Sequence, residues 1–490
     1  MVTTTNGAVR GKASADHREF LAIPFAAPPT GQLRFRPPSP TPSWTGVRDA
    51  TKPGPVCPQS LPLGTVSEDC LQLNVFTPPA AESRNLPVMV WFHGGGYVFG
   101  SAYGYNPTPL VTQGKVIVVT VNYRFGPFGY LALPQLAAES NTTGNYGVLD
   151  QQAALRWVRA NIASFGGNPR NVTIFGESAG GHSVCMQLIS PSAAGLFAKA
   201  ISESGGCVGT ALGPVTTQGA YTTGENLAKA VGCTDPATVV SCLRGKPLND
   251  LLKAGGGGLS SAVSWLPTID GTVIKEPPRD ALTSGRYNHV PMIVGTNANE
   301  GRLFAALFYH LQKLRHANQD DLRQEIQFRA GKLTQALLDT YRPASATNAD
   351  LATAAVTTDG AFACPALFTV RAAKSNPGQV VYQYEFADPN APLSNLDPFM
   401  NLGDYHASEL FYLFATVQGV PSLLNNDQKR LSRQMTTYWT TFARTGNPNG
   451  LGTPTWPVSS GTNPQVQRLT SRGTAPFTDF APDHDCALWS

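Results

Sequence analysis

Ser178 is the residue whose surroundings most clearly indicate covalent chemistry. It is the centre of Gly176-Glu177-Ser178-Ala179-Gly180, a Gly-x-Ser-x-Gly pattern in which a serine sits on a sharp turn between a strand and a helix. The flanking glycines let this turn pass close to its neighbours, where side chains would collide. The pattern therefore predicts a nucleophile at Ser178. Glu177 either tunes the charge beside the nucleophile or is a solvated neighbour.

A second glycine-rich segment, His93-Gly94-Gly95-Gly96, offers a place for a developing negative charge. Consecutive glycines allow backbone N–H groups to point into a shared space. We expect Gly95, Gly96 and Ala179 to donate their N–H groups to the oxyanion of a tetrahedral intermediate. One such donor contributes about 3 kcal/mol of transition-state stabilisation. His93 is expected to support this loop rather than to act as a base.

Strand-like and helix-like segments alternate around these two motifs. Strands are predicted at 88–92, 116–121, 172–175, 292–294 and 380–384, helices at 149–162 and 179–190, and a mainly helical region around 301–375. This alternation predicts an α/β fold with a large, mostly parallel central sheet flanked by helices. Functional residues gather at the carboxyl ends of the strands in such sheets. The chain has no internal repeat or long linker, so we expect residues 1–490 to form a single domain.

The eight histidines of the chain compete for the role of general base. His406 follows a glycine-containing loop between apolar segments, as a base presented to a site would. His182 comes four residues after the serine, and we expect the helix to carry it away. The residues themselves leave the acidic partner open among Glu300, Asp404 and Glu409.

Four motifs, occurring together and in order, give the chain a specific resemblance to a known family. They are Ser67-Glu68-Asp69-Cys70-Leu71-Gln72-Leu73-Asn74-Val75, Phe92-His93-Gly94-Gly95-Gly96, Asn122-Tyr123-Arg124 and Phe175-Gly176-Glu177-Ser178-Ala179-Gly180-Gly181. From about Gly7 to near its C-terminus the chain resembles the type-B carboxylesterases, which include cholinesterases and bacterial p-nitrobenzyl esterases. The resemblance implies the α/β-hydrolase fold. It also implies a serine esterase that forms an acyl-enzyme and requires no metal or organic cofactor.

The resemblance further implies roles for individual residues. The Gly-x-Asn-x-x-Glu-Gly segment of the family matches residues 295–301, which makes Glu300 the acidic partner. Its His-x-x-Glu-Leu segment makes His406 the base. The order Ser178, Glu300, His406 is the order of nucleophile, acid and base in α/β-hydrolases. Ser204 matches a serine that hydrogen-bonds near the histidine–acid pair in relatives.

Cysteine usage bears on the compartment in which the protein works. The resemblance pairs Cys57 with Cys70 and Cys233 with Cys242, and it leaves four cysteines unassigned: Cys185, Cys207, Cys364 and Cys486. Disulfides persist in oxidising compartments. The N-terminus has neither the basic nor the apolar region of a signal peptide. We therefore expect a secreted or periplasmic protein whose signal peptide was removed, with a cytoplasmic protein as the alternative.

The expected substrate class follows from the first disulfide loop and from the residues just after Glu300. In the family that the chain resembles, the cholinesterases carry a tryptophan for choline inside the first disulfide loop. The matching loop here, between Cys57 and Cys70, contains no Trp or Tyr, so a cation–π site for choline is not expected. Leu303 and Phe304 lie just beyond Glu300 and are expected to line an apolar pocket for uncharged esters of short to medium chain length. The short loop also disfavours the amphipathic lid of an interfacial lipase. A lipase or carbamate hydrolase with the same triad and a non-catalytic binding domain are the alternatives.

Composition excludes several other classes of partner. The net charge is +4 over 490 residues and Lys and Arg do not cluster, so no nucleic-acid binding is expected. No apolar run approaches the ~18 residues of a membrane helix, and no membrane insertion is expected. Cys and His do not cluster at zinc-finger spacing, so we expect no metal site. The expected partner is a small-molecule ester, and the sequence does not determine the oligomeric state.

Overall fold

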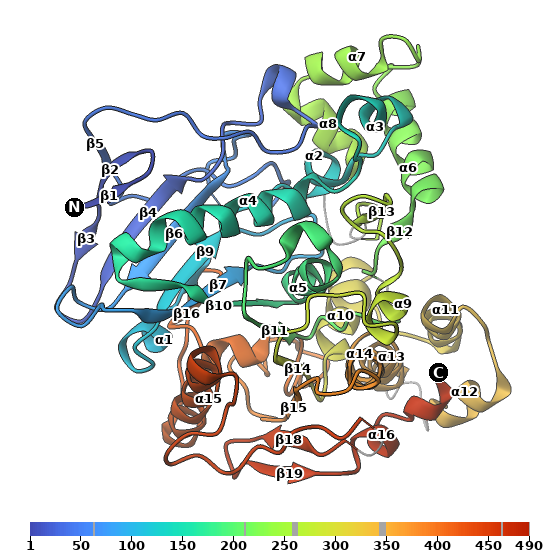
Figure 1. The fold of residues 1–490 in the computed structure, drawn as a ribbon. Coiled ribbons are helices and arrows are strands. Elements are labelled where there is room, and N and C mark those ends of the chain that lie inside the picture. Colours follow the sequence, from blue (N-terminus) through green and yellow to red (C-terminus); the bar gives the residue numbers. More distant parts are fainter. Residues whose placement is uncertain (62–63, 210–211, 257–262, 343–348, 462–463, 490) are drawn as a thin grey trace.

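A mixed eleven-stranded sheet forms the centre of the protein in the computed structural model, which describes residues 1–61, 64–209, 212–256, 263–342, 349–461 and 464–489 (Figure 1). The strands follow the order β19-β18-β15-β14-β11-β10-β7-β9-β6-β4-β3 across the sheet. Their bounds are β3 Lys12–Ala13, β4 Arg18–Pro24, β6 Gln72–Thr77, β7 Leu86–Phe92, β9 Ile117–Val121, β10 Gly167–Glu177, β11 Lys199–Glu203, β14 Met292–Asn297, β15 Val381–Phe386, β18 Val466–Leu469 and β19 Ala475–Phe477.

The middle of this sheet is parallel, from β9 through β7, β10, β11, β14 and β15 to β18. Antiparallel strands complete both edges, with β6, β4 and β3 on one side and β19 on the other. The predicted α/β fold with a mostly parallel sheet is confirmed. The turn-rich N-terminal region also contributes β4 and β6, which the sequence did not reveal. The strand predicted at 172–175 begins earlier, at Gly167.

Buried residues on both faces of the sheet explain why its central strands read as continuous apolar runs. All seven residues of β7 are buried. Val88, Val90 and Phe92 belong to the core on one face, whereas Met89 and Trp91 belong to the core on the other. This alternation is the two-residue period of a strand, and burial on both faces is typical of parallel sheets.

Helices cover the two faces separately. Helices α4, α5 and α14 contribute to the first core, and α1 and α15 to the second (Figure 1). The helix bounds are α1 Thr108–Thr112, α2 Gly126–Tyr130, α3 Pro134–Ser140, α4 Tyr146–Asn161, α5 Ala179–Ile189, α6 Thr217–Ala230, α7 Val239–Gly245, α8 Leu248–Gly255, α9 Pro278–Thr283, α10 Gly301–Ala305, α11 Gln319–Ala330, α12 Gln335–Thr340, α13 Ala349–Thr358, α14 Cys364–Lys374, α15 Asn426–Thr445 and α16 Phe480–Asp483. The short strands outside the central sheet are β1 Val2–Thr4, β2 Gly7–Arg10, β5 Val47–Asp49, β8 Tyr105–Asn106, β12 Val215–Thr216, β13 Thr268–Ile269, β16 Thr416–Val417 and β17 Val420–Pro421.

The region around 301–375 is mainly helical, with described non-helical segments at 313–318 and 331–334, and residues 343–348 lie outside the described part. It contains α10 to α14 and two π-helical turns, at Ala306–Gln312 and Asp359–Ala363. One continuous helical stretch, Ala349–Lys374, is long and apolar enough by length and composition to cross a membrane. Within its most apolar window 83% of the residues are buried inside the fold, as in a core helix. The sequence reading overlooked this stretch because polar residues interrupt it.

Four disulfides link described segments of the chain. Two are the expected bridges, Cys57–Cys70 and Cys233–Cys242. The others are Cys185–Cys207 and Cys364–Cys486, whose pairing the sequence left open. Cys185–Cys207 ties α5 to the segment after β11. A fold with all eight cysteines oxidised is typical of an oxidising compartment.

Candidate active site

Ser178 lies at the junction between β10, which ends at Glu177, and α5, which begins at Ala179. Its backbone has φ 57° and ψ −124°, angles that cost energy for a residue with a side chain. A Cβ atom on Gly180 would lie 1.9 Å from the carbonyl oxygen of Phe92, and one on Gly176 would lie 2.6 Å from the same atom. The motif therefore requires glycine at both positions because the turn passes directly against β7.

His406 is held by Glu300, which closes the turn after β14. The distance between His406 Nδ1 and Glu300 Oε2 is 2.6 Å. The other carboxylate oxygen of Glu300 accepts hydrogen bonds from the Asn297 backbone N–H at 2.8 Å and from the Thr296 hydroxyl at 2.9 Å. Both residues of the pair are buried. The carboxylate is thus fixed on one side by β14 and faces the imidazole with the other.

The other two carboxyl groups that the sequence left open have different partners. Asp404 accepts a hydrogen bond from the Asn299 side chain. Glu409 accepts one from Asn297 Nδ2 at 2.5 Å. Of the three alternatives, the structure therefore brings Glu300 into contact with the imidazole of His406.

The second ring nitrogen of His406 faces Glu177. His406 Nε2 lies 3.1 Å from Glu177 Oε1. The rings of Phe304 and Phe362 pack beside the imidazole, with centroids 5.0 and 4.7 Å away. The histidine is thus held at Nδ1 by Glu300 and flanked by two aromatic rings, while the carboxyl group of Glu177 lies close to Nε2 without a hydrogen bond to it.

Several buried carboxyl groups surround this pair. Burial, together with the charges of Glu300 and Glu203, raises the pKa of Glu177 well above its usual range. Burial and the charges of Glu177, Glu300 and Glu203 do the same to the pKa of Glu409. Burial raises the pKa of Glu203 to about 8, although Trp439 Nε1 donates a hydrogen bond to it. Like charges at close range and loss of water both disfavour the ionised form.

Two other histidines lie near the site but are held neutral. Burial lowers the pKa of His93 to about 4, and His93 Nδ1 lies 2.8 Å from the Gly94 carbonyl while its ring stacks on Tyr123. Burial also lowers the pKa of His182 to about 3. The prediction that the helix carries His182 away is wrong, because His182 lines the same cavity as Ser178. Residues four apart lie on the same face of a helix.

A cavity of about 570 Å³ connects the predicted site residues. Its wall includes Gly95, Gly96, Glu177, Ser178, Leu303, Phe304, Leu307, Phe308, Phe362 and His406. Ala179 follows Ser178 as the first residue of α5, where backbone N–H groups lack acceptors within the helix. Gly95 and Gly96 have φ of 107° and 61°, a conformation that favours glycine. A Cβ on Gly95 would lie 2.1 Å from the Phe99 carbonyl oxygen.

Ser204 follows β11 and also has positive φ, at 48°. Its backbone N–H donates to the Gly295 carbonyl at 2.9 Å, which joins it to the strand that leads to Glu300. Its hydroxyl is buried and has no hydrogen-bond partner among the described residues. The structure therefore places Ser204 beside β14 without a contact from its hydroxyl to the histidine–acid pair.

The profile of the Carboxylesterase family matches residues 1–489. The chain belongs to this family. It is 37% identical to a human (Homo sapiens) protein named cocaine esterase over 93% of this chain and 85% of that protein. It is 36% identical to carboxylesterase 1C of Mus musculus, over 98% of this chain and 93% of that protein. A solved structure titled PNB esterase superposes with a TM-score of 0.84 at 34% identity and covers 99% of both chains.

Membership of the carboxylesterase family, with esterases among the relatives, makes this chain a serine carboxylesterase. The expected resemblance and the expected α/β-hydrolase fold are both confirmed. Four residues that the sequence reading did not single out shape the site: Asn297, Glu203, Leu307 and Phe362. Asn297 belongs to the motif that contains Glu300, which was the available signal. Phe362 lies about 60 positions beyond Leu303 in the sequence, and no local pattern brings it to His406.

Proposed function

We propose that Ser178, His406 and Glu300 are the nucleophile, general base and acidic partner of this carboxylesterase. The single observation that carries this proposal is the 2.6 Å contact between His406 and Glu300 at the wall of the cavity that Ser178 also lines. A carboxylate on Nδ1 fixes the tautomer and leaves Nε2 free to accept a proton. The strained turn at Ser178 and the burial of Glu300 support the same assignment.

In the proposed mechanism, His406 Nε2 takes the proton from Ser178 Oγ while that oxygen attacks the ester carbonyl. The backbone N–H groups of Gly95, Gly96 and Ala179 donate to the oxyanion. His406 then gives the proton to the leaving alcohol, and an acyl-enzyme remains on Ser178. Water repeats the sequence and releases the acid. Glu300 stabilises the imidazolium formed in each half-reaction.

Glu177 and Ser204 are proposed to position this machinery. The carboxyl group of Glu177 is 3.1 Å from His406 Nε2, and its raised pKa favours a neutral acid that does not compete for the proton as a second base. Ser204 is proposed to act through β14, because its N–H is bonded to Gly295, five residues before Glu300.

The proposed substrates are uncharged carboxylic esters of short to medium chain length. The volume of about 570 Å³ suits a small organic ligand. Leu303 and Phe304, with Leu307, Phe308 and Phe362, provide an apolar wall beside His406. Such a wall stabilises an acyl or alkyl chain by burial at about 25 cal/mol per Å² of apolar surface.

We further propose that residues 1–490 form one domain and that the protein works outside the cytoplasm, as a secreted or periplasmic enzyme without insertion into a membrane. The eleven-stranded sheet uses strands from Lys12 to Phe477, which supports a single domain. The four disulfides support an oxidising compartment.

Hydrolysis of p-nitrophenyl acetate, butyrate, octanoate and palmitate tests the function and the pocket together. We expect wild type to hydrolyse the shorter esters and Ser178→Ala to be inactive. The exposed Ser284, away from the cavity, supplies the control variant Ser284→Ala, which should retain full activity. Equal residual activity of wild type and Ser178→Ala would contradict the assignment of the nucleophile. A preference for palmitate as an emulsion would favour the lipase alternative.

A further inference from the structure

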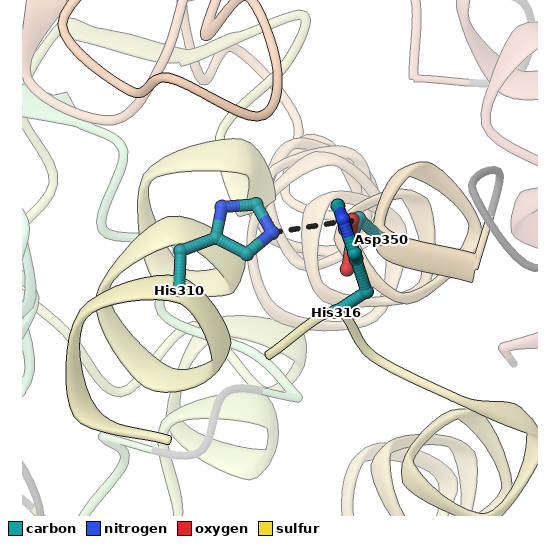
Figure 2. A group of neighbouring side chains, drawn as sticks. All are labelled: His310, His316 and Asp350. Carbon is teal, nitrogen blue, oxygen red and sulfur yellow. Dashed lines mark hydrogen bonds and ion pairs between the residues drawn. The ribbon is translucent and has the colours of Figure 1, made fainter. Parts of the chain in front are cut away.

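A cluster of two histidines and two aspartates lies outside the catalytic machinery, on the helical flank of the cavity. Its members are His310 in the π-helical turn Ala306–Gln312, His316 in the following loop, Asp350 in the first turn of α13, and Asp397 in a loop before the catalytic histidine. Figure 2 shows the imidazole of His310 pointing toward Asp350, with His316 beside that carboxylate. The ligand atoms of His310, His316 and Asp350 all lie within 4.8 Å of one another.

Asp350 presents one carboxylate oxygen to both histidines. Its Oδ1 accepts a hydrogen bond from the Ala317 backbone N–H at 2.6 Å. Its Oδ2 lies 2.6 Å from His316 Nδ1 and 3.1 Å from His310 Nε2. Two ligand atoms of a tetrahedral zinc ion are about 3.3 Å apart, given bonds of about 2.0–2.1 Å. His310 Nε2 and Asp350 Oδ2 are close to this separation, whereas the His316 ring, now hydrogen-bonded to Oδ2, would move outward to make room for an ion.

The tautomer of His310 makes Nε2 a free donor of an electron pair. His310 Nδ1 is 2.8 Å from Asp397 Oδ2, whose carboxylate also accepts hydrogen bonds from the backbone N–H groups of Phe399 and Met400. A carboxylate behind a ligand histidine is the usual arrangement in zinc sites, where it fixes the ring and raises its basicity. With the proton on Nδ1, the lone pair of Nε2 points into the cluster.

That lone pair is buried and has no hydrogen-bond partner among the described residues. His310 is 4% exposed and Asp350 is 2% exposed. An N–H on Nε2 would not be aligned for a hydrogen bond with Asp350, although the two atoms are 3.1 Å apart, so with the proton on Nδ1 the Nε2 lone pair is open to a cation. The side chain of His316 is 44% exposed and gives solvent a path to the cluster.

We propose that His310, His316 and Asp350 bind a divalent transition-metal ion of the zinc class. Two imidazole nitrogens and one carboxylate oxygen suit zinc and its neighbours rather than calcium or magnesium. Water completes the coordination. This site revises the expectation of no metal, which considered clustering in the sequence, whereas the ligands come from three separate segments.

The metal site ties the cavity wall to α13, which lies behind it. The turn that carries His310 also carries Leu307, Phe308 and Tyr309, all of which line the cavity. Asp350 is on α13, which packs against α10. A bound ion thus fastens this wall to α13 and stabilises the folded protein by an amount that grows with the logarithm of the ion concentration above Kd.

Zinc binding to the full-length protein tests the proposal without reference to ester hydrolysis. The protein is treated with EDTA, desalted and titrated with Zn²⁺ against a chromophoric chelator, and Tm is measured with and without Zn²⁺. We expect one tight equivalent per chain and a rise in Tm. His316→Ala removes a largely exposed side chain and should leave the fold intact. It should weaken binding at least tenfold, since loss of even a hydrogen-bond partner behind a ligand costs roughly 10–100-fold.

Two further variants complete the design. Asp397→Asn keeps a hydrogen-bond acceptor for Nδ1 but removes the charge, and we expect roughly 10-fold weaker binding. His289→Ala removes an exposed histidine outside the cluster and should bind Zn²⁺ as wild type does. Equal affinity and equal Tm shifts for wild type and His316→Ala would overturn the proposal. So would failure of wild type to bind one equivalent, since the cluster would then be a hydrogen-bonded network alone.

Discussion

Besides His310, two buried histidines each lie between two carboxyl groups, in different regions of the molecule. His406 has Glu300 at 2.6 Å and Glu177 at 3.1 Å from its two nitrogens. His484, near the C-terminus, has Asp359 at 2.6 Å and Glu385 at 2.8 Å. The distances are similar, but His484 hydrogen-bonds both of its carboxylates and His406 only that of Glu300. The surroundings differ, because His406 lines the cavity with Ser178 and two phenylalanines, whereas His484 packs against Phe480.

The comparison shows that a carboxylate pair around a histidine does not by itself make a base. Burial disfavours the charged form of His484, but its two hydrogen-bonded carboxylates outweigh burial and raise its pKa to about 10. Its partners are bonded further, Asp359 to Tyr341 and Glu385 to Arg468. His484 is therefore a cation at neutral pH that joins segments, while His406 lines a substrate cavity together with Ser178.

The largest difference between the two regions should appear in activity. His406→Ala removes the proposed base, and we expect kcat/KM for p-nitrophenyl butyrate to fall roughly 10⁴–10⁶-fold. Tm should change little, because the removed imidazole faces the cavity and solvent there can fill the space that it leaves. Steady-state kinetics with thermal melts of the same samples measure both. A fall of less than tenfold would show that another group takes the proton from Ser178.

His484→Gln should produce the opposite pattern. Removal of the charge leaves Asp359 and Glu385 buried with an incomplete partner, which costs about 3–5 kcal/mol of unfolding free energy. Urea unfolding measures this loss, and kcat/KM of the folded fraction should stay within about threefold of wild type. Activity that falls as far as in His406→Ala would remove the distinction between the two regions.

The pH dependence of stability sharpens the comparison further. The pKa of His484 is raised from 6.5 to about 10 on folding. Its contribution to stability is therefore fully present below pH 6.5 and is lost as the pH rises through 10. We expect the Tm difference between wild type and His484→Gln to be largest at pH 6 and to shrink steadily by pH 10.5. A Tm difference that stays constant with pH would mean that Asp359 and Glu385 do not raise the pKa of His484.

The smallest effect should come from the pocket beside His406. Leu303→Ala removes apolar surface from the cavity wall, and we expect the ratio of kcat/KM for octanoate over acetate to fall about tenfold. Leu311→Ala is the matched control, because Leu311 is 69% exposed on the same helical flank. Its ratio should equal that of wild type. An unchanged ratio in Leu303→Ala would mean that the acyl chain binds elsewhere in the cavity.

Local features of the fold and site could be predicted from the sequence, and long-range contacts could not. The turn at Ser178 and the loop at Gly95 and Gly96 are encoded by adjacent residues, because backbone strain and the close approach of neighbouring backbone require glycine at those positions. The acidic partner was different. Glu300, Asp404 and Glu409 are equivalent as residue types, and only the family resemblance chose Glu300.

His182 was misplaced although the signal was local, since residues four apart lie on the same face of a helix. The remaining failures have a long-range cause. Cys364 pairs with Cys486 across 122 positions, a separation that carries no local signal. The ligands proposed for zinc also come from separate segments. Where tertiary packing decides which groups meet, residue type and spacing leave several answers open.

Labelling with a fluorophosphonate tests the central claim that Ser178 is a nucleophile activated by His406. Intact-mass and peptide analysis would follow the reaction in wild type, Ser178→Ala, His406→Ala and His484→Gln. We predict one adduct per chain on the peptide that contains Ser178, none in Ser178→Ala, slow labelling in His406→Ala, and a wild-type rate in folded His484→Gln. An adduct on a different residue, or equal labelling of Ser178→Ala, would contradict the account.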